Sequence, residues 1–447
     1  MGESKVTVAI TTYNQKETLL QCLEWIRDIP QIANVIVVDN GSEDGTAEIL
    51  PELGCGFIYF DEGIQGYGKV WNAALANFDT EETVVFLEPQ FFPGKKSMQR
   101  MEKILRGQDC GIAAPICNGS FYSQNITIKS LDSLCALEDL PFQEDAAFYR
   151  SLDVEHGIWA LSRKTWQELG MFEEKLCHPK NVLLDYKLRL VENGRQPIVC
   201  RQAFAYCLSG GSISSYFQAF LRTDDRKALK DKWHMNYFNV LPSRNLVDFI
   251  SEQKDAPIRV LEVGCDLGAT LLEVKNRYPN SQTYGLEING PAADIAGHLA
   301  EVKTGDIEKG EIPFAGKFDY IIFADVLEHL HDPHGVVRLC QEKLAAHGHI
   351  LASIPNLMHI SVMEQLLSGR FQYEDTGLLD RSHIHFFTFY EIRRMFQDEG
   401  YELQEIKNTI TPLTEKQEKL LNKLLAISEN VDSHMYETVQ YLIKAGK

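Results

Sequence analysis

The stretch VLEVGCDLG, residues 260–268, decides the fold of the second half of the chain. It is an apolar, strand-like run that leads directly into a turn with glycines at positions 264 and 268. Gly264 and Gly268 let the backbone bend tightly and leave room for a ligand to lie against it. Enzymes that bind nicotinamide dinucleotides use a similar turn, so this stretch alone leaves the cofactor open.

Three more expected strands follow, and an acid stands at the end of each. Glu287, in GLEI (285–288), lies about 20 residues past the glycines, where a carboxylate can accept both ribose hydroxyls of an adenosine. Asp306, in GDI (305–307), suits an adenine amino group, and Asp325 opens DVLEHL (325–330). Because parallel strands end at one edge of a sheet, we expect a single cofactor pocket there. Its predicted contacts are Glu262, Gly264, Asp266, Gly268, Glu287, Asp306, Ile307 and Asp325.

The order and residues of these motifs resemble those of the class I S-adenosylmethionine-dependent methyltransferases, particularly the branch acting on small molecules and glycans. IPN (354–356) and RSHIHFFT (381–388) are similar to later motifs of that branch. The resemblance implies a Rossmann-like domain with S-adenosylmethionine as its cofactor. Asp266 departs from the pattern, since many members have glycine there.

Histidines near these motifs are the candidates for catalysis. The sulfonium of the implied cofactor is already activated, so the protein mainly has to orient an acceptor and, for a hydroxyl acceptor, remove its proton. Imidazole titrates nearest neutral pH, which selects His329, His383 and His385. The alternative is that His329 only packs against the turn or hydrogen-bonds to it. A metal held by the histidines at 329, 331 and 334 is disfavoured, because Asp332-Pro333 interrupts the helix that would align them.

The pattern of expected elements divides the chain into two α/β domains. A chain of 447 residues exceeds one ordinary core, and short apolar runs alternate with amphipathic stretches throughout. The pattern restarts near Leu241-Pro242, with a helix expected at 245–252, so we predict domains at 1–238 and 239–447. Both are expected to be built on mostly parallel sheets.

In the first half, VTVAITTYN (6–14) and VIVVDNGSEDGT (35–46) resemble the family-2 glycosyltransferases, which adopt the GT-A fold. The resemblance implies that Asp39 accepts hydrogen bonds from a uracil or similar base and its ribose, with Thr12 and Tyr13 as the opposite wall. GYGKVWN (66–72), which contains Lys69, is similar to the segment near the diphosphate. The implied nucleotide-sugar contacts are Thr12, Tyr13, Asp39, Lys69 and Glu88.

Three chemical positions of that family are altered here. The family's cation-binding acids fall on LEPQ (87–90), where Gln90 replaces the last acid, although Glu88 could still bind Mg or Mn. The family's catalytic base falls on Leu183, next to a surviving Asp185, and a later histidine falls on Cys207. We therefore expect a domain whose metal-dependent chemistry is lost or changed, and which still binds a nucleotide, a sugar or a glycan.

Net charge, apolar runs and cysteine content limit the classes of partner and the compartment that we expect. A formal charge of −19 argues against a nucleic-acid reader, which needs a basic face. No apolar run reaches the roughly 18 residues of a membrane span, so a glycolipid substrate would be met at a membrane surface. Ten cysteines without a CxxC pair indicate reduced thiols and a cytoplasmic protein.

Two hypotheses for function follow from the fused halves. In the first, the second half O-methylates a sugar of a surface glycan or its precursor, and the first half transfers or positions the sugar. In the second, the acceptor is a quinone or another small metabolite, and the first half is a non-catalytic interaction module. A scaffold with two inactive halves is a third alternative, which the intact cofactor motifs disfavour.

Overall fold

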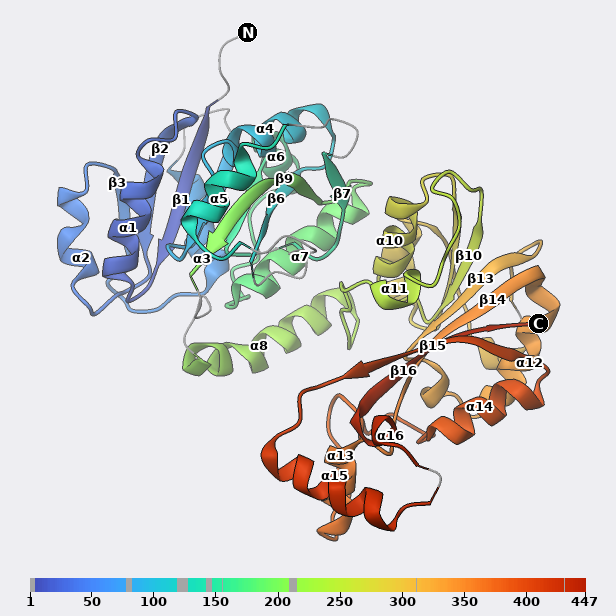
Figure 1. Cartoon of the computed structure of the whole chain (residues 1–447). Coiled ribbons are helices and arrows are strands. Elements are labelled where there is room, and N and C mark those ends of the chain that lie inside the picture. The colour runs from blue at the N-terminus through green and yellow to red at the C-terminus, as the bar shows by residue number, and fades with distance from the viewer. Residues whose placement is uncertain are drawn as a thin grey trace. The chain divides into compact units, whose positions relative to one another are not determined.

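The computed structural model describes residues 5–77, 83–118, 128–141, 147–154, 156–208, 215–310, 312–429 and 431–447 (Figure 1). Contacts divide the chain into two compact units, Met1–Tyr237 and Phe238–Lys447, and each unit has its own sheet. The prediction of two α/β domains is confirmed.

The first sheet is mixed, and its parallel part carries the motifs of the first half. Strand β1 (Val6–Thr12) is buried along its whole length, as expected for a central strand covered on both faces. It pairs in parallel with β2, and Thr12 stands opposite Asp39 at the end of the two strands. Across the sheet the strands are β3 (Gly56–Tyr59), β2 (Ile32–Asp39), β1 (Val6–Thr12), β4 (Thr83–Leu87), β8 (Ile158–Leu161), β6 (Ile112–Cys117), β9 (Ile198–Cys207) and β5 (Phe91–Pro93), with β7 (Phe148–Arg150) paired to β9.

Two layers of helices cover this sheet. Apolar residues of α1 and α4 pack with the aliphatic core of β1 and β4. On the other side an aromatic cluster joins α3 and α7 to the sheet, with the rings of Phe86 and Trp159 stacked 4.4 Å apart. The helices are α1 (Lys16–Ile26), α2 (Thr46–Ile49), η1 (Leu50–Glu52), α3 (Tyr67–Ala76), α4 (Ser97–Gly107), α5 (Leu131–Glu138), α6 (Arg163–Leu169), α7 (Pro179–Glu192) and α8 (Ser215–Trp233).

The second sheet has five parallel strands, and an antiparallel strand is inserted near one edge. Strand β16 lies between β14 and β15 and runs antiparallel to both. The strand order reverses at β10, the point where open α/β sheets bind ligands. In sheet order the strands are β12 (Glu301–Thr304), β11 (Gln282–Glu287), β10 (Arg259–Val263), β13 (Phe318–Ala324), β14 (Leu344–Pro355), β16 (Thr438–Gly446) and β15 (Glu402–Ile410).

Alternate residues of β10 face two different layers of helices, as a strand's period of two requires. Leu261 and Val263 belong to the core shared with α12 and α14, whereas Val260 packs with α9 and α10. A smaller cluster joins α13, α15 and α16. The helices are α9 (Arg244–Val247), α10 (Ala269–Arg277), α11 (Gly290–Gly297), η3 (Ile307–Lys309), η4 (Leu327–His329), α12 (Pro333–Lys343), α13 (Ile360–Leu367), α14 (Phe389–Asp398), α15 (Glu415–Ile427) and α16 (Ser433–Glu437).

The helix expected at 245–252 is shorter than its sequence suggests. Helix α9 ends at Val247, because the N–H groups of Phe249 and Ile250 bond to carbonyls only three residues back. This tighter turn buries both side chains in the core that α9 shares with α10.

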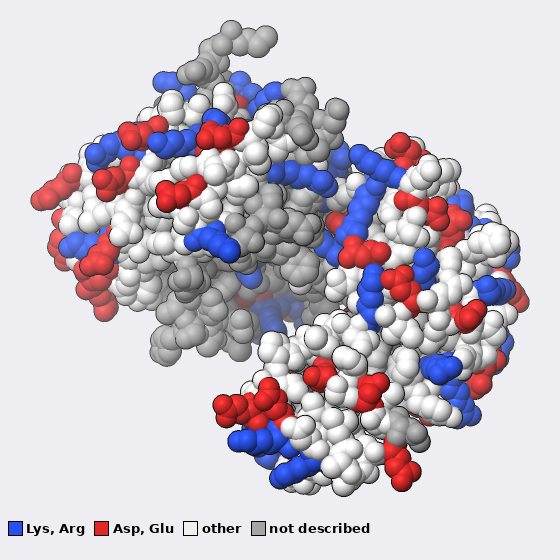
Figure 2. All heavy atoms as spheres, in the orientation of Figure 1, with Lys and Arg blue, Asp and Glu red and all other residues white. Residues whose placement is uncertain are grey.

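The surface carries charges of both signs. On the face shown in Figure 2, acidic and basic side chains are interspersed over both units. None of the helices in the described parts of the chain has the length and apolar character that crossing a membrane requires.

Candidate functional site

The turn after β10 needs glycine at two positions. Gly264 has φ +70°, and a Cβ there would lie 2.7 Å from a methyl group of Val326, in the loop after β13. Gly268 has φ +81°, and its Cβ would lie 3.2 Å from Ala296 of α11. L-residues with side chains rarely adopt this left-handed conformation. Both positions therefore require glycine, because of the backbone conformation and because neighbouring side chains leave little room for a Cβ.

Asp266 stands between these glycines and is itself left-handed, with φ +43°. Its carboxylate accepts a hydrogen bond from the backbone N–H of Asn239 at 2.9 Å. Burial nevertheless raises the pKa of Asp266 to about 6. The aspartate that departs from the family pattern thus ties the turn to the first residues of the second unit.

Glu287, at the end of β11, is held next to the same turn by hydrogen bonds from the backbone. Its two oxygens accept hydrogen bonds from the backbone N–H groups of Asp266 and Asn289, each at 2.8 Å. An ionised carboxylate has about four acceptor positions, so roughly two remain for a ligand diol. Glu287 is therefore a buried, oriented acceptor beside the turn.

Glu262 adds a third acid below the turn. It is buried in β10, and its Oε2 has no hydrogen-bond partner among the described residues. Burial raises the pKa of Glu262 to about 8, against the opposing effect of a hydrogen bond with Thr270. Glu262 is therefore mostly protonated at neutral pH.

The remaining predicted cofactor contacts follow the neighbouring strands. Asp306 caps η3 by accepting from the N–H of Glu308 at 3.0 Å, whereas the side chain of Ile307 packs into the main core. Asp325 has φ +55°, and its N–H donates to Ser353 Oγ at 2.9 Å. Because β12, β11, β10 and β13 are adjacent and parallel, these groups and the glycine turn share one edge of the sheet.

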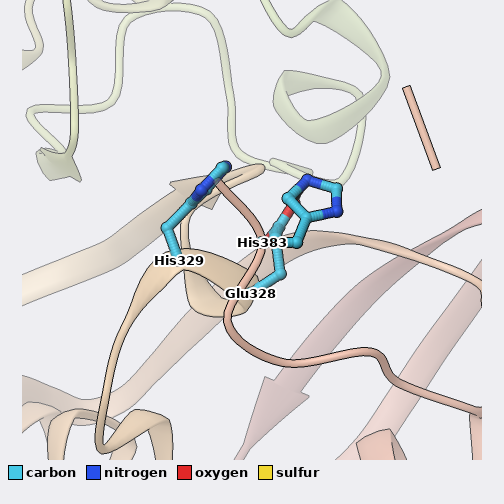
Figure 3. A group of neighbouring side chains, drawn as sticks. All are labelled: Glu328, His329 and His383. Carbon is cyan, nitrogen blue, oxygen red and sulfur yellow. Dashed lines mark ion pairs between the residues drawn. The ribbon is translucent and has the colours of Figure 1, made fainter. Parts of the chain in front are cut away.

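Next to this edge, Glu328, His329 and His383 form a compact group (Figure 3). One ligand atom from each lies within 4.8 Å of the others, and the two imidazole rings meet edge to face at 4.8 Å. His383 Nε2 lies 3.9 Å from Glu328 Oε1. The loop that carries His383 is held against η4, because the N–H groups of Ile384 and His385 both donate to the Glu328 carbonyl.

Protonation within this group follows from burial. Glu328 is 1% exposed, and neither carboxylate oxygen has a hydrogen-bond partner among the described residues. Burial, reinforced by the charge of Asp325, raises the pKa of Glu328 well above its usual range. Burial and then the neighbouring His329 lower the pKa of His383. Both shifts favour the uncharged forms, a protonated Glu328 and a neutral His383.

His329 is oriented by a backbone contact. Its Nδ1 lies 3.1 Å from the carbonyl oxygen of Ser382. A carbonyl can only accept, so Nδ1 carries the hydrogen of the neutral ring and Nε2 keeps a free lone pair. His329 can therefore accept a proton, and the same donor set (two imidazoles and a carboxylate) could also hold a divalent cation.

The other histidines lie apart from this group. His385 Nε2 contacts the carbonyl of His331 at 3.3 Å, His331 faces Glu308, and His334 faces Glu399. The structure thus brings two of the three candidate bases together and adds Glu328, which was not among the predicted site residues. Its signal in the sequence was an acid three residues after the strand-end Asp325.

In the first unit, Asp39 and Thr12 form the corresponding edge. Asp39 is fully buried, and its Oδ1 accepts from the hydroxyl and N–H of Ser42. Its Oδ2 and the Thr12 hydroxyl have no hydrogen-bond partner among the described residues. Burial raises the pKa of Asp39. Two buried acceptors therefore remain for a ligand at this edge.

The other predicted contacts surround this edge. Tyr13 is half-buried directly after β1. Lys69 Nζ lies 3.0 Å from Gln65 Oε1 and 3.8 Å from Glu62. Glu88 is buried after β4 and accepts a hydrogen bond from the side-chain amide of Gln90 at 2.6 Å. The pairing of Glu88 with an amide donor does not fit the acid pair that the family's cation requires.

These two sheet edges define a two-domain α/β protein with a nucleotide-sugar type unit and a Rossmann-like unit. The model of glycosyl transferase family 2 matches residues 7–167, and the model of a methyltransferase domain matches residues 234–406. The chain joins a family-2 glycosyl transferase domain to a methyltransferase domain. Both resemblances inferred from the motifs are confirmed.

Relatives by sequence match part of the chain. Polyketide synthase ThaQ of Burkholderia thailandensis is 30% identical over 158 residues, covering 32% of this chain and 7% of that protein. The ubiquinone biosynthesis O-methyltransferase of Acinetobacter baylyi is 24% identical over 144 residues, covering 29% of this chain. The chain spans 60% of that second relative's length.

Solved structures were also compared. A SAM-dependent methyltransferase from Archaeoglobus fulgidus has a TM-score of 0.33 at 18% identity, covering 49% of this chain and 99% of its own. PKMT2 from Rickettsia typhi, in complex with AdoHcy, has a TM-score of 0.31 at 18% identity, covering 42% of this chain and 48% of its own.

Proposed function

We propose that the second domain transfers the methyl group of S-adenosylmethionine to a hydroxyl of a sugar, in a glycan or its precursor. The observation that carries this proposal is the arrangement of Glu287 across the glycine turn. An adenosine ribose needs a fixed carboxylate acceptor, and Glu287 supplies one, because the N–H groups of Asp266 and Asn289 hold its two oxygens.

The charge of the pocket supports this cofactor. Glu262, Asp266 and Glu287 lie together at the end of β10 and β11. Burial raises the pKa of Glu262 and of Asp266, and the negative charge of Glu287 raises both further. A cationic ligand relieves this repulsion, and S-adenosylmethionine carries a sulfonium and an ammonium group. Gly264 and Gly268 would line the close approach, and Asp306 would face the adenine. When bound, the cofactor supplies an electrophilic methyl group.

The chain's own residues would handle the acceptor proton. His329 Nε2 has a free lone pair, and His383 is neutral at physiological pH because of its burial. An acceptor hydroxyl placed at this group can transfer its proton to an imidazole as the new bond forms. Glu328 would orient His383 and share the proton within the buried group.

Aromatic side chains beside His383 support a ring-shaped acceptor. Phe371 and Tyr373 are exposed, and their rings meet edge to face at 5.4 Å. Phe386 lies 5.4 Å from Phe371 and 6.0 Å from His383. Aromatic faces flanked by hydrogen-bonding groups suit a sugar, whose C–H face stacks while its hydroxyls bind the polar groups. The fused glycosyl transferase domain favours a sugar over other rings.

A quinone precursor or another small metabolite is the second candidate acceptor. The similarity to an enzyme named for ubiquinone biosynthesis favours it, and the same aromatic residues could stack on a planar ring. The first domain would then be an interaction module.

All ten cysteines are free thiols, which supports a reaction in the reducing cytoplasm for either acceptor.

A methyl-transfer assay with a panel of acceptors tests the proposal. The full chain would be incubated with methyl-labelled S-adenosylmethionine and either methyl pyranosides and nucleotide sugars or dihydroxybenzoate-type quinone precursors. We expect label in the sugars. Label only in the aromatic acceptors would favour the second candidate, and label in neither class would contradict both.

A further inference from the structure

The position of the family's cation in the first domain is filled by hydrogen bonds between side chains. Gln90 Nε2 donates to Glu88 Oε2 at 2.6 Å, and Gln15 Nε2 donates to Gln90 Oε1 at 3.1 Å. His156 Nε2 lies 3.9 Å from the other Glu88 oxygen. Glu88, Gln90 and His156 are all buried. Glu88 therefore already faces an amide donor and an imidazole.

This arrangement opposes cation binding. Mg²⁺ and Mn²⁺ are held by several oxygens, usually including carboxylates, at about 2.0–2.2 Å. The Gln90 amide N–H directed at the Glu88 carboxylate places a partial positive charge where a cation would sit. Turning the Gln90 oxygen toward a cation would break the bonds to both Glu88 and Gln15, in a buried place where unpaired polar groups are costly.

The residues at the position of the family's catalytic base are also unsuitable. Leu183 is apolar and buried in α7. Asp185 survives nearby, but its oxygens are bonded to Arg189 (3.1 Å), Trp233 (2.9 Å) and Lys232 (2.7 Å). Asp185 is fully buried and joins α7 to α8, which is a structural role.

The nucleoside end of the same domain keeps its binding groups. Asp39 Oδ2 and Thr12 Oγ1 are buried without hydrogen-bond partners among the described residues. Such groups are stable only where a ligand or water satisfies them. They face one edge because Thr12 and Asp39 are paired in register on β1 and β2. The nucleoside end thus keeps its acceptors, whereas the cation and base positions do not keep theirs.

We propose that the first domain binds a nucleoside diphosphate at the Thr12–Asp39 edge without a divalent cation and does not transfer a sugar. The bonded chain of Gln15, Gln90 and Glu88 replaces the cation site. The domain then serves as a binding module that brings a nucleotide-linked substrate to the chain. This inference does not depend on the methyl-transfer activity of the second domain.

Calorimetric titration of the full chain, saturated with S-adenosylhomocysteine, tests the inference with uridine, guanosine, cytidine, adenosine and thymidine diphosphates. We expect one of them to bind with the same Kd in EDTA and in MnCl2, and no release of sugar from the matching nucleotide sugar. Asp39→Asn should weaken that binding by about tenfold or more, since it removes a charge-assisted acceptor. Binding by none of the five, or unchanged binding in Asp39→Asn, would overturn the proposal.

A gain-of-function variant tests the cation position directly. Gln90→Asp restores a second acid beside Glu88, so Mn²⁺ should now tighten nucleotide binding, whereas the exposed Gln253→Asp should change nothing. The free Mn²⁺ signal in electron paramagnetic resonance measures cation uptake in each variant. The proposal is overturned if the unaltered chain takes up Mn²⁺ with the nucleotide and Glu88→Gln abolishes that uptake, or if sugar is released. Thermal melting of each variant checks that it is folded.

Discussion

The backbone N–H of Asp266 donates to the side chain of Glu287 at 2.8 Å, joining the turn after β10 to the end of β11. The two residues belong to different motifs of the sequence, and this bond joins them in space. It fixes the Glu287 carboxylate beside the left-handed turn, where we propose that the ribose binds. Most expected consequences of substitutions in the second domain follow from this pocket and its neighbours.

Gly264→Ala should destabilise the second domain. The new Cβ would lie 2.7 Å from Val326 and would force a residue with a side chain to keep φ at +70°. We expect a loss of about 1–3 kcal/mol in the free energy of unfolding, measured by denaturant titration. Gly297→Ala is the matched control, because no atom lies within 4 Å of its Cβ. Equal stability of the two variants would contradict the assigned geometry.

Glu262→Gln should make stability less dependent on pH. The folded pKa of Glu262 is about 8, against 4.5 as the ordinary value, so the folded state binds an extra proton between these pH values. Stability from this group is complete below about pH 4.5 and is lost as pH rises through 8. Melting temperatures at pH 5 and pH 8 should therefore differ less in Glu262→Gln than in the unaltered chain. An unchanged difference would show that Glu262 is ionised in the folded state.

His383→Ala and Glu328→Gln should lower kcat while leaving the Kd of S-adenosylmethionine unchanged. Loss of the general base in His383→Ala should cost about 10²–10⁴-fold in rate, and loss of its carboxyl neighbour in Glu328→Gln should cost less. The activity of the unaltered chain should persist below pH 6.5, because burial lowers the pKa of His383 and keeps it neutral there. His385→Ala is the control, since its ring faces the His331 carbonyl instead. Activity lost in EDTA and restored by a divalent cation would instead indicate metal-assisted catalysis.

Phe371→Ala and Tyr373→Ala should raise the KM for the acceptor several-fold and leave cofactor binding unchanged. Both side chains are exposed and contact Phe386, whose ring lies beside His383, so removing them takes away acceptor contact without emptying the core. Ile427→Ala, at a residue that is 80% exposed, is the control. Steady-state kinetics with the best acceptor of the panel would measure the effect. An unchanged KM would remove these rings from the site.

The fold and the cofactor edge follow from local chemistry in the sequence. A glycine turn after a buried strand and an acid at the end of each following strand are visible without a structure, because parallel topology brings such ends together. The pairing of Glu328 with His383 was not visible. It depends on a bend at Ile384 that folds a distant loop onto the Glu328 carbonyl. The ion pairs of Asp185 with Lys232 and Arg189 were equally hidden, because they join two helices that only tertiary packing brings into contact.

Titration calorimetry of the full chain with S-adenosylmethionine tests the central claim most directly. We expect binding that weakens by about tenfold or more in Glu287→Ala, since two charge-assisted hydrogen bonds to the ribose are lost. The exposed Glu415→Ala should bind like the unaltered chain. Absence of binding by the unaltered chain, or equal affinity in Glu287→Ala, would contradict the assignment of the β10–β11 edge as the methyl-donor pocket.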